Sequence, residues 1–264
     1  MNNLFDAAYR CIMETDLTEK VQLTQTTVQA WQAGELSLNT TNPAEPILMP
    51  GLPPNLCLVP PREVPRRSIA TPTGQAALLH ALTHIEFNAI NLAWDAVYRF
   101  RDLPKAFYDD WVKVADEEAM HFVLLHEQLQ QLGYKYGDLT AHNGLWEMAV
   151  KTQDDVLMRM ALIPRLLEAR GLDAVPPIIA KAKAQGLSLM IENLQIILRD
   201  EIGHVKIGSH WFFHCCAERG LNPETTFQNL VTQHFTSQIK GPFNIEARLA
   251  AGFSEQELQN LEKL

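Results

Sequence analysis

Apolar residues recur at intervals of three and four positions along most of the chain after residue 72, a spacing typical of amphipathic α-helices. The pattern predicts four long helices, over residues 73–101, 104–132, 152–185 and 187–219. The first two are separated by a turn at Leu103-Pro104 and the last two by a turn at Gln185-Gly186. The chain therefore reads as two antiparallel helical hairpins of an all-α protein.

Acidic residues interrupt the apolar stripes of these helices. Glu86 shares a stripe with Leu79 and Ile90, and Glu118 shares one with Val114 and His121. An ionised carboxylate on a buried face is costly unless it is paired or bound to a metal ion. The stripes therefore predict inward-facing carboxylates at a site. A metal-free core in which Glu–Arg or Glu–His pairs satisfy these charges is the alternative.

The strongest motif is a repeated Glu-x-x-His unit, found at Glu118–His121 and at Glu201–His204. Each unit follows one further glutamate, Glu86 or Glu168, at a distance of 32 or 33 positions. Residues three apart share one face of a helix, so each Glu and His can hold one ion between them. At 1.5 Å per residue, each preceding glutamate returns to the level of its motif in an antiparallel hairpin. The predicted metal ligands are Glu86, Glu118, His121, Glu168, Glu201 and His204.

The third helix is the least regular. Pro176 and Pro177 resemble a helix stop, but a turn there would lie too close to Glu168. A turn at Gln185-Gly186 instead gives legs of roughly 18 and 15 residues, which match the first hairpin. We therefore predict a long third helix with a kink or break near 170–177, and a second distortion at Pro164, which removes an intrahelical hydrogen bond.

The segment before the bundle combines two short helices, 3–14 and 16–33, with a proline-rich stretch. The second helix opens at Asp16, and Glu19 completes the pattern of a capping box. Nine prolines between positions 43 and 72 suit an extended segment. Interleaved apolar residues favour a strap docked on the surface over a disordered linker.

One compact domain with three parts is the predicted organisation. Residues 1–72 form the N-terminal helices and the strap, 73–219 the four-helix bundle and 220–264 an extension with two short helices. The 19 residues from Gly133 to Lys151 are long enough for the one long crossover that a bundle with two such hairpins needs.

Composition narrows the class of partner. The 264 residues carry a formal net charge of −9 and a pI near 5.5, which disfavours nucleic acid and anionic membranes without excluding an RNA substrate. No apolar run reaches membrane-spanning length, and the N-terminus lacks the pattern of a signal peptide. The four cysteines show no C-x-x-C spacing. We expect a cytoplasmic protein with no membrane partner, and a homodimer is left open.

Carboxylates with a minority of imidazoles suit iron or manganese better than structural zinc, and iron is favoured. Glu118 and Glu201 are placed to bridge two metal ions, with Glu86 and Glu168 as terminal ligands and one histidine for each ion. Six side chains on two ions leave positions open for dioxygen, peroxide or water. Around them, Glu117 and Asp200 could each accept the free ring N–H of the histidine on the opposite helix, or could be surface acids. No catalytic residue is predicted beyond the metal site.

The stretches around these ligands resemble a known family. His84-Ile-Glu86, Ala115–Phe122, Glu168–Asp173 and Arg199–Val205 are similar to an uncharacterised, domain-of-unknown-function family of ferritin-like proteins. The resemblance covers most of the chain and implies a ferritin-like fold with a dinuclear metal site on the six residues named above. It implies no reaction. The ligand motif alone is also similar, more distantly, to the di-iron tRNA hydroxylases and to rubrerythrin-like proteins.

These features favour a dinuclear oxidoreductase, an oxygenase or oxidase that activates dioxygen or peroxide and oxidises or hydroxylates a small-molecule substrate. Its substrate and its external electron donor are not identified by the sequence. Two alternatives remain: a metal-handling ferroxidase, peroxide scavenger or iron store, and a non-catalytic helical scaffold stabilised by metal.

Overall fold

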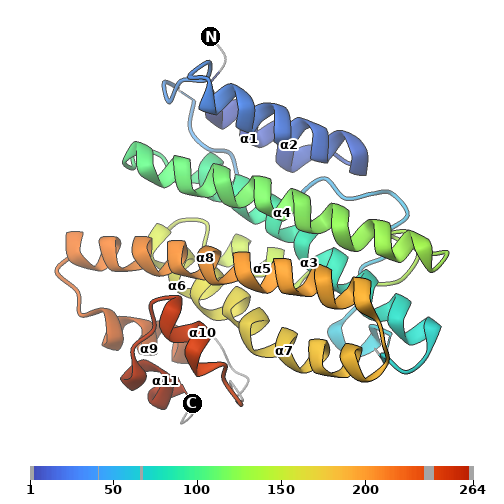
Figure 1. Ribbon diagram of the computed structural model, residues 1–264. Helices are drawn as coiled ribbons and strands as arrows, with labels where there is room; N and C mark the ends of the chain where they lie inside the picture. The colour runs from blue at the N-terminus through green and yellow to red at the C-terminus, as the bar shows by residue number, and fades with distance from the viewer. Residues whose placement is uncertain (1–2, 41, 66–67, 235–240, 262–264) are drawn as a thin grey trace. The chain divides into compact units, whose positions relative to one another are not determined.

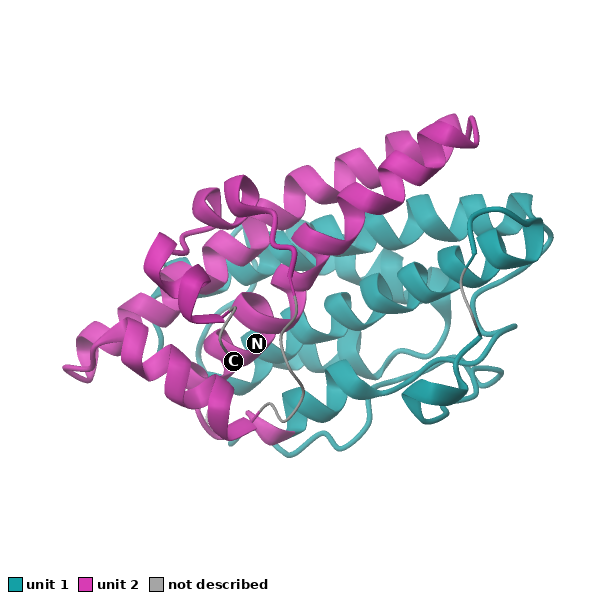
Figure 2. Cartoon of the chain, turned by 90° about the horizontal axis from the view of Figure 1, so that it is seen from below, with its two compact units in different colours: residues 1–150 teal, residues 151–264 magenta. Residues whose placement is uncertain are grey.

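The computed structural model describes residues 3–40, 42–65, 68–234 and 241–261. Across these ranges the regular secondary structure is helical, and the β-type pairing is limited to two isolated bridges. The predicted all-α class is therefore confirmed. The chain divides into two compact units, Met1–Val150 and Lys151–Leu264, coloured separately in Figure 2. Within the described ranges, no helix is both long enough and apolar enough to cross a membrane.

Unit 1 is built around one long helical hairpin (Figure 1). Its helices are α1 (Leu4–Met13), α2 (Leu17–Gln32), the short 3-10 helix η1 (Pro61–Glu63), α3 (Pro72–Arg99), α4 (Lys105–Gln131) and α5 (Gly144–Lys151), which ends at the unit boundary. The predicted hairpin over 73–101 and 104–132 corresponds to α3 and α4, with each end within two residues.

Local chemistry explains where this hairpin begins and turns. Thr71 Oγ1 accepts the backbone N–H of Gly74 at 3.2 Å, and Pro72 occupies the first turn of α3, where its missing N–H costs nothing. Between the two helices, Asp102 adopts a positive φ of 62°. Helices α3 and α4 pack along each other, α1 packs on α3, and α2 packs on α4.

Helix α2 starts at the predicted cap, with one difference. The Asp16 carboxylate accepts the backbone N–H groups of Thr18 and Glu19, at 2.9 and 3.0 Å. The N–H of Asp16 itself donates to Glu14 Oε1 at 2.8 Å. The reciprocal hydrogen bond of the capping box is thus made by Glu14, two residues before the cap, and not by Glu19.

The proline-rich segment is docked on unit 1, as predicted. Ile47 is buried, the Gly51 N–H donates to the Ile12 carbonyl at 2.9 Å, and Trp146 Nε1 donates to the Leu48 carbonyl at 3.2 Å. Further along, the N–H of Val59 donates to the Ala141 carbonyl at 2.8 Å. The segment therefore connects α1 to the stretch after α4, which contains α5.

Unit 2 holds the second hairpin and the C-terminal tail. Its elements are α6 (Val156–Leu162), the π-helical segment η2 (Ile163–Glu168), α7 (Ala169–Ala184), α8 (Ser188–Glu218), α9 (Pro223–His234), α10 (Ile245–Ala250) and α11 (Glu255–Leu261). The predicted third helix is thus present as α6, η2 and α7, and the predicted fourth as α8. The turn lies at Gly186, which adopts a positive φ of 69°. The tail has three short helices in the described ranges, so the prediction of two is wrong.

The interruption of the third helix lies at Pro164. Of the kink or break predicted near 170–177, the break is absent. Helix α7 continues through Pro176 and Pro177. A proline at 176 leaves the carbonyl of Leu172 without its intrahelical donor. Asn244 Nδ2 from the tail donates to that carbonyl at 3.2 Å. A distant segment therefore supplies a donor that the local sequence lacks.

Assembly of the two hairpins into a single four-helix bundle over 73–219 stays a prediction, as do the domain boundaries given above.

Candidate metal centre

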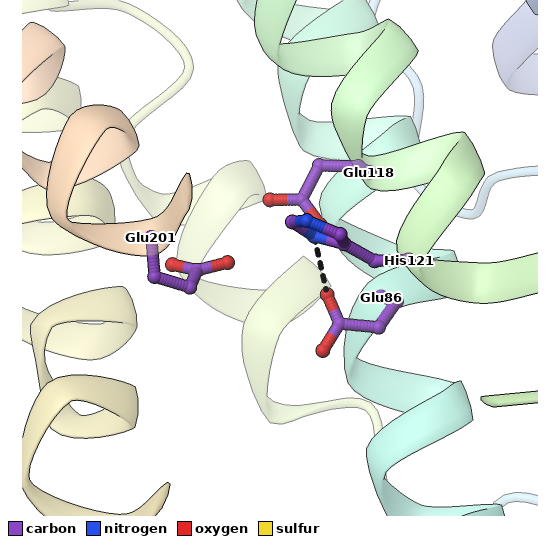
Figure 3. A group of neighbouring side chains, drawn as sticks. All are labelled: Glu86, Glu118, His121 and Glu201. Atoms are coloured by element: carbon purple, nitrogen blue, oxygen red, sulfur yellow. Dashed lines mark hydrogen bonds and ion pairs between the residues drawn. The ribbon is translucent and has the colours of Figure 1, made fainter. Parts of the chain in front are cut away.

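Three predicted ligands meet inside the α3–α4 hairpin of unit 1. Glu86 projects from α3, and Glu118 and His121 project from α4, three positions apart. One ligand atom from each lies within 4.8 Å of the other two. His121 Nδ1 lies 3.4 Å from Glu118 Oε2 and 3.7 Å from Glu86 Oε2. Figure 3 shows these side chains turned toward one another; it also labels Glu201, which belongs to unit 2.

These three side chains are withdrawn from solvent. Glu86 is 4% exposed, Glu118 1% and His121 0%. Glu86 Oε2 makes no hydrogen bond with any described residue, although it lies in a polar group. A buried carboxylate oxygen without a donor requires a cation or a proton. The donor set, two carboxylates and one imidazole, could hold a metal ion.

The electrostatics of the group point the same way. Burial and the neighbouring charge of Glu118 raise the pKa of Glu86 well above its ordinary value. Burial alone would lower the pKa of His121, but the hydrogen bond to Glu118 and the charges of Glu118 and Glu86 outweigh it and raise that pKa to about 11. Without a metal, the group therefore holds a proton to offset its negative charge. A divalent cation would take the place of that proton.

Unit 2 repeats the local geometry of the motif. Glu201 and His204 project from α8, with His204 Nδ1 3.4 Å from Glu201 Oε1. Glu201 is nearly buried and His204 fully so. The same ring atom faces the same partner at the same distance in both repeats. In each motif, Nδ1 is therefore the candidate ligand atom, which leaves Nε2 for an outer acceptor.

Glu168 is the last residue of η2, the π-helical segment opposite α8 in this hairpin. A close contact fixes its level: a Cβ built on Gly208 of α8 would lie 2.3 Å from Pro164 Cβ. Glu168 comes four residues after Pro164, and His204 four residues before Gly208. Because the two helices run in opposite directions, Glu168 and His204 lie at the same level of the hairpin. Glu168 is half-buried.

Glu117 and Asp200, the predicted outer residues, each pair with a neighbouring cation. Lys113 Nζ lies 3.0 Å from Glu117, and Arg199 Nε lies 2.8 Å from Asp200. The side chain of Asp200 is only 11% exposed. That the two acids accept the free ring N–H of the histidine on the opposite helix stays a prediction.

Two further buried residues near Glu168 were not singled out from the sequence. Arg165 and Arg248 are 0% and 1% exposed. Arginine is ordinarily a surface residue, and no local pattern marks either of them as buried. Their partners, Glu257 and Asp173, lie 92 and 75 positions away in the sequence. Only the folded chain reveals these pairs.

Comparison with known proteins places the chain in a family. A family model described as "Protein of unknown function (DUF455)" matches residues 13–259. An uncharacterised protein of Haemophilus influenzae is 43% identical over an alignment that covers 89% of this chain and 94% of that protein. No solved structure matches the chain. The predicted resemblance to an uncharacterised family is confirmed, and the chain belongs to the DUF455 family.

Proposed function

We propose that the protein is a dinuclear metal oxidoreductase that uses dioxygen or peroxide to oxidise or hydroxylate a small-molecule substrate. The observation that carries the proposal is the buried group in unit 1, where Glu86 Oε2 has no hydrogen-bond donor among the described residues. The Glu201–His204 repeat in unit 2 has the same local geometry as Glu118–His121.

Each hairpin supplies two carboxylates and one imidazole if Glu168 is counted with Glu201 and His204. Three side chains would leave a single iron or manganese ion short of its preferred six ligands. We propose that both sets serve one dinuclear centre, with Glu118 and Glu201 as bridging ligands. The resemblance to ferritin-like proteins supports this arrangement, and iron is the proposed metal because carboxylates outnumber imidazoles.

The chain's own residues would hold the ions and control their surroundings. The ions supply redox chemistry when bound. On metal binding, the group of Glu86, Glu118 and His121 would give up the proton that it otherwise holds, and His121 would bind through Nδ1. Apolar neighbours on α3 and α4, among them Phe87 and Phe122, keep bulk water out of the interior. An external donor would have to supply electrons, because the cysteines show no paired spacing for a built-in relay.

Metal analysis of natively purified protein tests the proposal directly. We expect about two metal ions per chain, with iron in excess of manganese. The variant Glu118→Gln should lose metal while keeping its helical circular dichroism. Glu127→Gln is the matched control, because Glu127 is an exposed glutamate on the same helix. Metal content in Glu118→Gln equal to the control would refute the site.

Oxygen uptake separates the proposed activity from the alternatives. Ferrous iron is added anaerobically to the metal-free protein, and air is then admitted in the presence and absence of an electron donor. Sustained donor-dependent oxygen consumption supports an oxidoreductase. A single stoichiometric oxidation of iron that never repeats indicates a ferroxidase or store. No optical change and no oxygen uptake indicate a scaffold.

A further inference from the structure

The C-terminal tail contacts η2 and α7 on both sides of Glu168. Arg165, three residues before Glu168, reaches toward the tail. Asp173, five residues after it, receives Arg248 from the tail. The segment between these two anchors contains the end of the π-helical segment η2 and the start of α7.

The first anchor is the guanidinium of Arg165. Its Nη1 and Nη2 both donate to Glu257 Oε1 at 3.1 Å, and Nη2 also donates to the Gly252 carbonyl at 3.4 Å. Its Nε donates to Ser209 Oγ of α8 at 3.0 Å. Arg165 therefore ties η2 to α8 and to the tail at once, and Glu257 compensates its buried charge.

Aromatic rings enclose this guanidinium. Its Cζ lies 4.6 to 4.9 Å from the ring centroids of four phenylalanines, Phe212, Phe213, Phe227 and Phe253. Stacking against ring faces favours a planar guanidinium, which an ammonium cannot imitate. The enclosure restricts Arg165 to one position, and with it the backbone of η2.

The second anchor is the pair formed by Arg248 and Asp173. Arg248 Nη2 lies 2.6 Å from Asp173 Oδ2, and Nε lies 3.0 Å from Asp173 Oδ1, which makes the pair bidentate. Arg248 Nη2 also donates to the carbonyl of Ala169, the residue after Glu168, at 3.3 Å. The Asn244 N–H adds a bond to Asp173 Oδ1 at 2.8 Å.

The segment between the anchors needs this support. Pro164 removes one intrahelical hydrogen bond at its start, and η2 has π-helical rather than α-helical bonding. Pro176 removes the donor to the Leu172 carbonyl, which Asn244 replaces. Without this support, a helix weakened at both places would let the Glu168 side chain occupy several positions.

We propose that the tail is a clamp whose function is to position Glu168 as a metal ligand, with Arg165 and Arg248 as positioning residues. The inference rests on the proposed function, because it requires Glu168 to bind metal. It assigns residues 241–261 a role in metal affinity, although they carry no ligand themselves.

The test compares two Arg→Met variants of the full-length protein. Arg248→Met removes the second anchor. Arg219→Met is the matched control, because it removes an ion pair with Asp155 in the same unit, at 2.7 Å, away from the clamp. Metal per chain is measured on the monodisperse folded fraction, by titration of the metal-free protein with manganous ion. A second measurement follows hydrogen exchange of residues 163–173 without metal.

Arg248→Met should weaken one of the two bound ions about 10- to 100-fold, the range for loss of a residue that orients a ligand, and should leave the other unchanged. Hydrogen exchange in 163–173 should rise, while exchange in α8 stays at the level of the control. Arg248→Lys should restore affinity only in part, since an ammonium lacks the planar fork. If Arg248→Met fails to fold, Asn244→Ala, which removes only neutral hydrogen bonds, should show the same selective loss.

Wild-type affinity for both ions in folded Arg248→Met would overturn the clamp while leaving the proposed function intact. Equal weakening of both ions would also overturn it, because that result indicates general destabilisation. If the wild-type protein binds no metal, the proposed function fails first and the positioning role fails with it.

Discussion

Lys20 Nζ on α2 donates to Asn91 Oδ1 on α3 at 2.7 Å, although Lys20 is fully buried. The same ammonium donates to the carbonyls of Cys11 and Ile12, at 2.7 and 3.0 Å. Those carbonyls belong to the last turn of α1 and have lost their intrahelical donors. One side chain therefore caps α1 and joins three helices of unit 1.

This arrangement predicts a pH-dependent effect of Lys20→Met. Burial lowers the pKa of Lys20 from 10.5 to about 7. Since the unfolded chain binds the extra proton between these values, the wild-type free energy of unfolding rises with pH across that window, by at most about 1.4 kcal/mol per pH unit. Lys20→Met loses this dependence and also loses hydrogen bonds worth about 1–3 kcal/mol.

Urea unfolding at several values from about pH 7 to about pH 9 checks this expectation. Relative to wild type, the variant should lose stability steadily as the pH rises. A deficit that stays constant or shrinks with rising pH contradicts the argument. The measurements stop at about pH 9 so that the adjacent Cys11 stays a thiol in the folded protein. Burial raises the pKa of Cys11 above its ordinary value of 9.0.

Gly208→Ala should destabilise unit 2. The added methyl group would lie 2.3 Å from Pro164 Cβ, so α8 and η2 would have to separate. We expect a loss of about 1–3 kcal/mol in the free energy of unfolding, typical of overpacking. Gly171→Ala is the control: Gly171 lies within α7 and an added Cβ there meets no atom within 4 Å. The control should be neutral or more stable by up to about 1 kcal/mol, and equal behaviour of the two variants would sink the explanation.

The local pattern was sufficient to predict the long helices. Thr71-Pro72 begins α3 and Gly186 forms the turn between α7 and α8, and each of these signals acts within a few residues of a helix end. Near 170–177 the sequence predicted a kink or a break, and the break is absent for the opposite reason. Pro176 is a strong local signal, but the donor that compensates it, Asn244, lies about 70 positions away and cannot be inferred from a nearby pattern.

The same distinction applies to the candidate site. The Glu-x-x-His spacing was enough to place Glu118 beside His121 and Glu201 beside His204, because a helix turn fixes both pairs. It also brought Glu86 to His121, since hairpin length sets their level. The burial of Arg165 was not predicted, because it depends on a carboxylate partner and on phenylalanine rings from distant segments.

Glu86→Gln should act in opposite directions with and without metal. In metal-free protein the amide avoids the cost of burying or protonating a carboxylate, and we expect an increase of about 1–3 kcal/mol in the free energy of unfolding. With manganous ion at about 100 times its dissociation constant, wild type should gain about 2.7 kcal/mol and the variant much less. Thermal unfolding in chelator and in metal measures both arms. A variant that is less stable even in chelator would favour the metal-free core, in which the Glu86–His121 pair is structural.

Asp200→Asn tests the proposed support around the ligands. Asp200 precedes Glu201, and its side chain is almost buried even though its partner Arg199 is 71% exposed. An acid that served only the exposed arginine would itself be exposed, so we expect its carboxylate to orient a ligand histidine. Loss of that charge should weaken metal binding about 10- to 100-fold. Arg199→Ala removes the exposed arginine of this pair, which is worth at most about 1 kcal/mol, and should leave metal affinity unchanged. Titration of both metal-free variants with manganous ion decides the matter, because equal affinities would reduce Asp200 to a surface acid.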